Sequence, residues 1–191
     1  MTVPRPPRAD AVRNRQRILD AAREQITAHG PDAGMDEIAA AAGVAVGTLY
    51  RHFPTKTDLV AAIIAEYTGQ VADYAEAARQ RHAAGSAAAD EIAGFLGQVI
   101  EASATNHAVK AAAHALGAHP ADQATEARAG AALAELIKAG QADGDIHADV
   151  TVDDIYLLFS AAPTDQPAPA RDRWLTLVLT GLTTRTRNPG S

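Results

Sequence analysis

The sequence predicts an all-α fold of about nine helices with no convincing strand. Apolar residues recur at spacings of three and four along most of the chain, which is the period of a helix with one buried face. The breaks in that period fall at Gly, Pro and Asp clusters, which end helices. Aromatic residues make up only 4% of the 191 residues while hydrophobic residues make up 47%, a balance that suits closely packed helices. The length allows one large domain or two small ones.

The N-terminal segment, residues 1–9, is rich in Pro and Arg and is expected to form a flexible basic arm. A first helix is expected from near Asp10 to His29. Its apolar stripe would consist of Val12, Ile18, Leu19, Ala22 and Ile26. Gly30 stands where that helix should end.

Two short helices joined by a tight turn are predicted around Gly43. Ile38, Ala39 and Ala42 lie at helical spacing before it. Gly43 can take the left-handed conformation that ends a helix. Val44 would then point back between the two helices. The pattern is that of a helix-turn-helix.

The second of these helices is expected to bury Val46, Leu49 and Phe53 on one face, because they recur at three and four residues. Pro54 cannot continue the helix and should end it. The polar side chains fall largely off the buried face: Thr48, Tyr50, Arg51 and His52. Such a polar cluster on a rigid apolar support is what reading DNA in the major groove requires.

A further helix should begin at Thr55, which can form a capping box with Asp58. Lys56 then lies in the first turn, where a cation opposes the helix dipole. That position makes sense if a phosphate binds both the ammonium group and the free amide hydrogens of the helix start.

The remaining helices follow from the same period and its breaks. The expected spans are 56–81, a helix around Ile92 to Ile100, then 106–117, 122–139, 152–162 and 170–186. Gly140 is expected to end the fourth of these. Thr151 and Asp154 should form a second capping box. The three prolines of residues 163–169 predict a loop.

The last two helices are apolar on more than one side, so each must be buried on two sides. A second copy of the chain is one source of the extra cover, and a central position in the core is the alternative. The residues that would form such a dimer interface are Ile155, Phe159, Trp174, Leu175, Val178 and Leu182.

The net charge of −6 is unevenly distributed. Residues 1–58 hold eight Lys or Arg and seven Asp or Glu, whereas residues 59–191 hold nine and sixteen. Five arginines precede residue 18 (Arg5, Arg8, Arg13, Arg15 and Arg17), and the last three are the better candidates to lie along phosphates. There is no cysteine and no apolar run of about 18 residues. We therefore expect a cytoplasmic protein with no membrane partner.

Residues 13–64 resemble the DNA-binding domain of the tetracycline-repressor (TetR) family of bacterial transcription regulators. The resemblance is carried by Arg15-Gln16-Arg17-Ile18-Leu19-Asp20-Ala21-Ala22, by Gly30, by Asp36-Glu37-Ile38-Ala39 through Gly43-Val44, and by the run from Val46 to Lys56. It implies that Thr48 and His52 meet base edges or phosphates, and that the backbone at Gly47 approaches the DNA. It also implies phosphate contacts from Tyr50 and Lys56. Arg51 would face either the DNA backbone or solvent.

Together these considerations give the candidate DNA-binding residues Arg13, Arg15, Arg17, Val46, Gly47, Thr48, Tyr50, Arg51, His52, Thr55 and Lys56. Four positions depart from the family pattern. Gly34 and Ala45 stand where capping Ser or Thr residues are usual, and Ala40 and Ala41 where basic residues are common. Weaker caps and fewer phosphate contacts put the DNA affinity in doubt more than the fold.

The stretch from Gly144 to Asp154, with Trp174 to Leu182, resembles the C-terminal domain of one subfamily, called SbtR-like. The family resemblance implies a two-fold dimer, a pseudo-palindromic operator and repression released by a small, fairly apolar effector. Polar or aromatic groups within the apolar helices are the candidate effector contacts: Tyr67, Phe95, His107, His114 and Tyr156. A protein without an effector is the alternative.

The expected domains are the arm (1–9), the helix-turn-helix domain (10–55), a helical regulatory and dimerisation domain (56–187) and a tail (188–191). Two other functions stay open. One is a helix-turn-helix adaptor that has lost DNA binding. The other is a helical-bundle enzyme, which lacks support because the sequence has no Glu-x-x-His pair, His-Glu-x-x-His motif, Gly-x-Ser-x-Gly elbow or Gly-rich phosphate loop. No cofactor or metal is expected.

Overall fold

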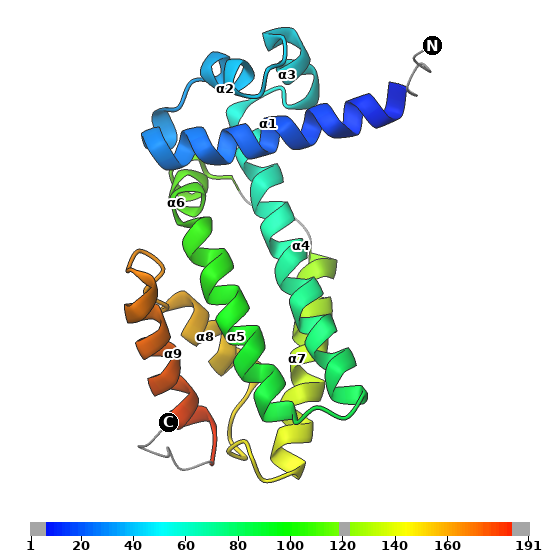
Figure 1. Ribbon diagram of the computed structural model, residues 1–191, viewed down its shortest axis with the longest axis vertical. Helices are drawn as coiled ribbons and strands as arrows, with labels where there is room; N and C mark the ends of the chain where they lie inside the picture. The colour runs from blue at the N-terminus through cyan, green and yellow to red at the C-terminus, as the bar shows by residue number, and fades with distance from the viewer. Residues whose placement is uncertain (1–6, 119–122, 185–191) are drawn as a thin grey trace. The chain divides into compact units, whose positions relative to one another are not determined.

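The computed structural model describes residues 7–118 and 123–184, with side chains from Asp10 onward. Over these residues the chain is all-α, as predicted, and its β-structure is a single isolated bridge between Ile146 and Thr183. The elements are α1 (Pro7–His29), the 3₁₀ helix η1 (Gly30–Asp32), α2 (Met35–Ala41), α3 (Val46–His52), α4 (Lys56–Ala83), α5 (Ala88–Thr105), α6 (His107–Leu116), α7 (Gln123–Ala142), α8 (Val152–Ser160) and α9 (Ala168–Leu182) (Figure 1). None of the helices in the described part combines the length and apolar character needed to cross a membrane. Two expected segments lie outside the described residues: the tail (188–191) and the first six residues of the arm, which include Arg5.

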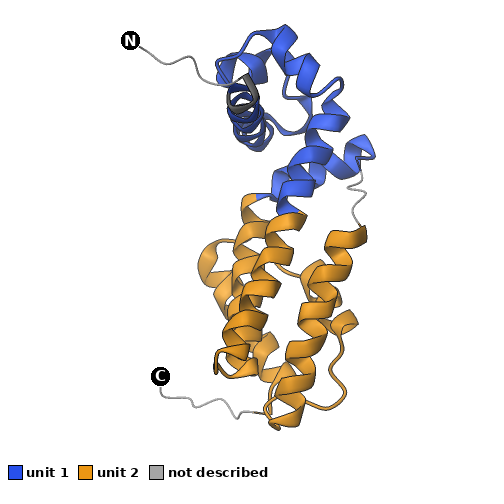
Figure 2. Cartoon of the chain, turned by 90° about the vertical axis from the view of Figure 1, so that its right-hand side faces the viewer, with its two compact units in different colours: residues 1–67, 106–121 blue, residues 68–105, 122–191 orange. Residues whose placement is uncertain are grey.

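The chain forms two compact units, coloured separately in Figure 2. The head unit consists of the described residues 7–67 and 106–118, and the body unit consists of 68–105 and 123–184. This division differs from the expected boundary after residue 55. The first turns of α4 and the whole of α6 belong to the head unit.

The head unit is built around α1, which contacts α2, α3 and α6. The largest fully buried side chains of this core are Ile18, Leu19, Ile26, Ile38, Leu49, Leu59 and Ile63. Val12 was expected to begin the buried apolar stripe of α1, but this is wrong, because its side chain is 69% exposed. No residue from Asp10 to Arg17 is buried, because these turns of α1 precede the part of the helix on which its neighbours pack.

The body unit packs α5 against α7 and α9, and α8 against α7. Its fully buried large side chains are Phe95, Leu96, Ile100, Leu133 and Leu136. The part of α4 in this unit contributes small side chains, the alanines at 72, 75 and 78, each with no exposed surface. Small residues at this spacing let neighbouring helices approach closely.

Gly140 does not end α7, which continues to Ala142. A Cβ built on Gly140 would lie 2.5 Å from Cγ1 of Ile146. Because Gly140 has no side chain, Ile146 in the segment after α7 can pack directly against the helix backbone. The expectation of a helix end rested on local propensity, whereas tertiary packing selects glycine at this position.

The capping box at the start of α8 is confirmed. The Thr151 amide and hydroxyl donate hydrogen bonds to Oδ2 of Asp154 over 2.8 and 2.7 Å. In return the Asp154 amide donates to the Thr151 hydroxyl over 3.3 Å. These bonds, first that from the hydroxyl, lower the pKa of the Asp154 carboxyl. The predicted loop before α9 is also present, but it is shorter than expected, since α9 already begins at Ala168 with Pro169 in its first turn.

Candidate nucleic-acid interface

The turn between α2 and α3 has the predicted geometry. Gly43 has a φ of +60°, in the left-handed region that favours glycine. The Val44 amide donates to the carbonyl of Ala39 over 3.0 Å, which ends α2. Val44 itself is half-buried and packs against the head-unit core, as a plug between the two helices should. Arg17 of α1 supports the turn from outside by donating to the Gly43 carbonyl over 3.1 Å.

Two side chains fix α3 to the head unit. Leu49 is fully buried and Phe53 is 4% exposed, as predicted from their spacing. Val46 was expected on the same face, but it is 40% exposed. Because Val46 is the first residue of a two-turn helix, no earlier turn of that helix adjoins it to complete a buried surface.

The outward side of α3 gathers the remaining candidates on one short helix. Gly47, Tyr50 and Arg51 are exposed like Val46, and Thr48 and His52 are half-buried. The Arg51 guanidinium donates to the Thr48 hydroxyl over 3.3 Å. The His52 ring packs at a tilt beside Phe53, with ring centroids 6.3 Å apart. The sequence thus correctly placed these residues together, on a helix held by two buried anchors.

From Asp10 onward, where side chains are described, each arginine of α1 has a partner within the head unit. Arg13 pairs with Asp10, one turn before it. Arg15 pairs with Glu66 over 3.4 Å, and its guanidinium lies 5.4 Å from the ring centre of Phe53. Arg17 and Arg15 are both exposed, so their remaining donors face solvent. The phosphate contacts expected of these three residues stay a prediction, and the side chain of Arg8 lies outside the described residues.

The start of α4 is capped as predicted. The Thr55 amide and hydroxyl donate to Oδ2 of Asp58 over 3.0 and 2.7 Å, and the Asp58 amide donates back over 3.1 Å. The ammonium of Lys56 donates to the carbonyls of Pro31 and Ala33. Lys56 therefore joins α4 to the η1 region, a structural contact that the sequence did not reveal.

The weak caps are also as predicted. Gly34 has no side chain to offer α2, but its own amide donates to Oε2 of Glu37 over 3.0 Å, which supplies half of a capping box. Ala45 makes no side-chain hydrogen bond at the start of α3. Ala40 and Ala41 are exposed, so neither a charge nor a hydrogen-bonding group stands at these two surface positions.

The candidate effector residues are divided between the units. In the head unit, the Tyr67 ring lies 5.0 Å from the Lys110 ammonium, while His107 and His114 are exposed. In the body unit, Phe95 is fully buried and meets Phe159 edge-on, with centroids 5.7 Å apart. Tyr156 is 43% exposed, and partial burial raises the pKa of its hydroxyl.

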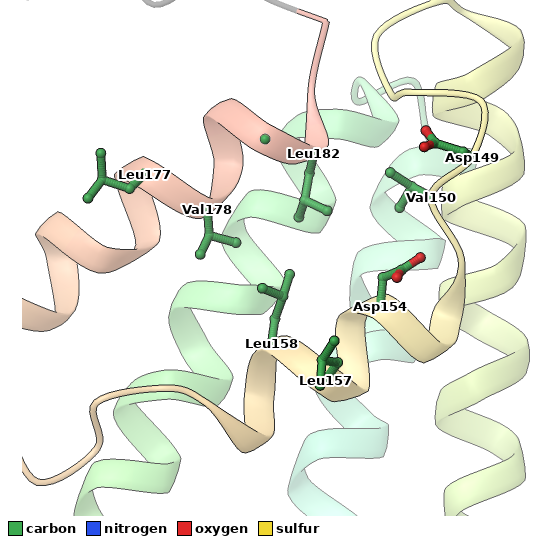
Figure 3. Close-up of a pocket in the computed structure, with 9 residues that line it drawn as sticks. Asp149, Val150, Asp154, Leu157, Leu158, Leu177, Val178 and Leu182 are labelled. Atoms are coloured by element: carbon green, nitrogen blue, oxygen red, sulfur yellow. The ribbon is translucent and has the colours of Figure 1, made fainter.

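The body unit has a hollow of about 410 Å³ between α8 and α9 (Figure 3). Its lining is Asp149, Val150, Asp154, Leu157, Leu158, Leu177, Val178, Gly181 and Leu182, which includes none of the five candidate effector residues. In Figure 3, Leu158 points from α8 towards α9, and Val178 and Leu182 point down from α9. Asp149 and Asp154 lie on the other side of the view from Leu177 and Val178.

The candidate dimer residues all lie on α8 and α9, but only Val178 and Leu182 line the hollow, and the six differ in exposure. Ile155 and Leu182 are buried within the chain, at 1% and 7% exposed, whereas Phe159, Trp174, Leu175 and Val178 are half-buried. The most exposed leucines were not among the candidates: Leu157 is 66% exposed and Leu177 is 49% exposed. Both belong to the all-round apolar pattern of their helices, which predicts that more than one face is covered but does not indicate which residues each face carries.

Two family descriptions match the chain. Residues 18–63 match "Bacterial regulatory proteins, tetR family", and residues 87–184 match "Transcriptional regulator SbtR-like, C-terminal domain". Among curated proteins, the chain is 48% identical over 58 residues to the uncharacterised HTH-type transcriptional regulator TtgW of Pseudomonas putida, covering 30% of this chain and 43% of TtgW. It is 47% identical over 51 residues to the HTH-type transcriptional repressor LfrR of Mycolicibacterium smegmatis, covering 27% and 26%. The chain thus spans less than half the length of these curated relatives.

Solved structures match over nearly the whole chain. A TetR transcription regulatory protein from Mycobacterium vanbaalenii is 32% identical, with a TM-score of 0.70, over 94% of this chain and 100% of that one. A TetR transcriptional regulator from Streptomyces coelicolor is 26% identical, with a TM-score of 0.66, over 90% and 99%. Both matches span the head and the body units.

Proposed function

The chain belongs to the TetR family of transcriptional regulators, and from that premise we propose that it is a dimeric repressor that binds a pseudo-palindromic DNA operator. The observation that carries the proposal is the outward side of α3. There Val46, Gly47, Tyr50 and Arg51 are exposed together on a helix anchored by the buried Leu49. A rigid helix with such a free face can enter the major groove.

Repression is supported by the name of one relative, the HTH-type transcriptional repressor LfrR, which is 47% identical over 51 residues. Dimerisation is supported by the exposed Leu157 and Leu177 on α8 and α9. Both leucines line the hollow between α8 and α9, and apolar side chains this exposed are a surface that a second copy would cover. Two recognition helices about 34 Å apart would then meet successive major grooves.

Release by an effector would follow from population shift: a small molecule that binds the body unit favours a dimer in which the two heads no longer match the operator spacing. The contact of the buried Phe95 with the half-buried Phe159 supports an effector that is fairly apolar. Of the other candidate contacts, Tyr156 lies in the body unit, whereas Tyr67, His107 and His114 lie in the head unit.

The experiment is fluorescence anisotropy of the purified protein titrated onto labelled DNA from upstream of its own gene. It is run at two salt concentrations, with and without unlabelled unrelated DNA. Saturable binding that survives the competitor and weakens with salt is expected of a sequence-specific regulator. Binding equal to that of unrelated DNA in every fragment of a genomic selection would overturn the proposal.

The adaptor alternative has one specific observation in its favour. Lys56 is bonded to the carbonyls of Pro31 and Ala33, and Thr48 is bonded to Arg51, so two expected DNA contacts have partners within the chain. In the adaptor reading, α3 would meet a protein instead of a groove. The genomic selection described above distinguishes the two, since an adaptor recovers no preferred sequence.

A further inference from the structure

The first turn of α3 presents an apolar surface. Ala45 precedes the helix, Val46 and Gly47 begin it, and all three are exposed. None of them carries a side-chain donor or acceptor. The first polar side chain is Thr48, which is half-buried and accepts a hydrogen bond from Arg51.

Val46 is the most prominent feature of this surface. It is 40% exposed, in contrast to Leu49 one turn later, which is fully buried. Nothing lies within 4 Å of a Cβ built on Gly47, so the surface next to Val46 is unobstructed at that position. Part of the Val46 isopropyl group therefore faces solvent at the start of the helix, with room for another molecule beside it at Gly47.

This inference rests on the proposed DNA binding and gives it a base preference. In helix-turn-helix proteins the N-terminal residues of the second helix contact base edges. An isopropyl group cannot exchange hydrogen bonds with a base edge. Among the four bases, only thymine presents an apolar group in the major groove, its C5-methyl. We propose that Val46 reads a thymine C5-methyl in each half of the operator.

The same contact would discriminate against other bases. Packed against Val46, the amino group of cytosine or the O6 and N7 acceptors of guanine would lose water without gaining a partner. The preference would thus come from an attractive methyl contact and from a desolvation cost at the other bases. Because both chains of a dimer carry Val46, the preferred thymine should occur at symmetric positions.

Deoxyuridine provides a direct test, because it differs from thymidine only by lacking the C5-methyl. Each thymine of a DNA fragment recovered by selection is replaced in turn, and affinity is measured by anisotropy at fixed salt. We expect one symmetric pair of positions at which each replacement weakens wild-type binding by about fourfold, the value for one buried methyl group. Val46→Ala should bind more weakly and lose this sensitivity at the same positions.

Two further variants keep the result interpretable. Val46→Ser leaves no methyl group at this position, so it should also lose the sensitivity, and it covers the case in which Val46→Ala impairs folding. Val12→Ala removes a side chain that is even more exposed but lies on α1, so it should retain the full sensitivity to deoxyuridine. Circular dichroism establishes that each variant is folded.

The outcomes distinguish the thymine contact of Val46 from the proposed DNA binding as a whole. Sequence-specific binding without any thymine whose methyl group matters to the wild type overturns the inference and leaves the proposed function standing. The same holds if the deoxyuridine loss persists unchanged in whichever of Val46→Ala and Val46→Ser is folded. Failure to bind any DNA specifically overturns the proposed function itself.

Discussion

Arg17 donates a hydrogen bond from Nη2 to the carbonyl oxygen of Gly43 across 3.1 Å, so α1 is bonded directly to the turn that aims α3. A Cβ built on Gly43 would lie 2.5 Å from the same nitrogen atom. Gly43 is therefore constrained twice, by its φ of +60° and by the approach of the guanidinium. The two constraints can be separated experimentally.

Gly43→Ala should lower the free energy of unfolding by about 2 kcal/mol, of which the left-handed conformation contributes about 1 kcal/mol and the displaced Arg17 hydrogen bond up to about 1 kcal/mol. Urea denaturation measures the change. Gly30→Ala is the matched control, because Gly30 has a φ of +67° but nothing within 4 Å of its built Cβ. In an Arg17→Met background the two substitutions should cost the same. Equal costs with Arg17 intact would refute a role for this contact.

Lys56 has two candidate roles, and one variant tests both. Lys56→Ala removes the donor to Pro31 and Ala33 and should lower the stability of the protein by about 1 kcal/mol. If Lys56 also meets a phosphate, DNA binding should weaken for all sequences and the salt slope should fall by about one.

Denaturation and anisotropy at several salt concentrations measure the two effects of Lys56→Ala separately. Lys138→Ala, on an exposed position of α7, is the control and should change neither. A loss of stability with an unchanged salt slope would show that Lys56 only fastens η1 to α4.

The features predicted correctly from the sequence are those fixed within one or two turns of chain. Gly43, the capping box of Thr151 with Asp154, and the buried pair of Leu49 and Phe53 all depend on neighbours fewer than five residues away. Val46 has the same periodicity but lies outside the core, because periodicity gives the direction of a side chain and not whether another helix lies there.

The other differences between expectation and structure have tertiary causes. Gly140 is required by Ile146, and the Lys56 ammonium is turned to carbonyls more than twenty residues away. Arg15 reaches Glu66, fifty-one residues away, which no local pattern in α1 indicates. Such contacts depend on how helices pack, and neither propensity nor spacing along one helix predicts them.

Glu76 of α4 makes the stability of the protein depend on acid pH. Arg79 holds its carboxylate with two hydrogen bonds of 2.7 and 2.9 Å, and Gln80 adds a third. These bonds, first those from Arg79, lower the pKa of Glu76 from 4.5 to about 2. A lowered pKa in the folded state stabilises the fold above the unfolded value, so this stabilisation is present above pH 4.5 and is lost as the pH falls towards 2.

Glu76→Gln should therefore flatten the decline of unfolding free energy between pH 4.5 and 2, measured by urea denaturation at several pH values. The effect should be small and should shrink at high salt, because the pair is accessible to solvent. In an Arg79→Met background the flattening should largely disappear. A wild-type profile identical to that of Glu76→Gln would count against the proposed pair.

Substitution of Leu157 and Leu177 tests whether the face formed by α8 and α9 is a dimer interface. They are 66% and 49% exposed, so within one chain neither contributes much to the core. Leu157→Asp and Leu177→Asp should each change chain stability by only about 0.5 kcal/mol, as measured on the monomeric species. A buried aspartate pair across a two-fold interface is costly, so sedimentation should shift from dimer to monomer.

The DNA affinity of these variants should fall by roughly a hundredfold or more, because a monomer loses the effective concentration gained when two linked heads bind neighbouring half-sites. Val12→Asp is the control for sedimentation, since Val12 is 69% exposed and lies on α1 of the head unit, whereas α8 and α9 belong to the body unit. Dimers that persist in both leucine variants would place the interface elsewhere. Monomers that bind the full operator as tightly as the wild type would remove the reason to expect a palindrome, because each half-site would then be sufficient for recognition.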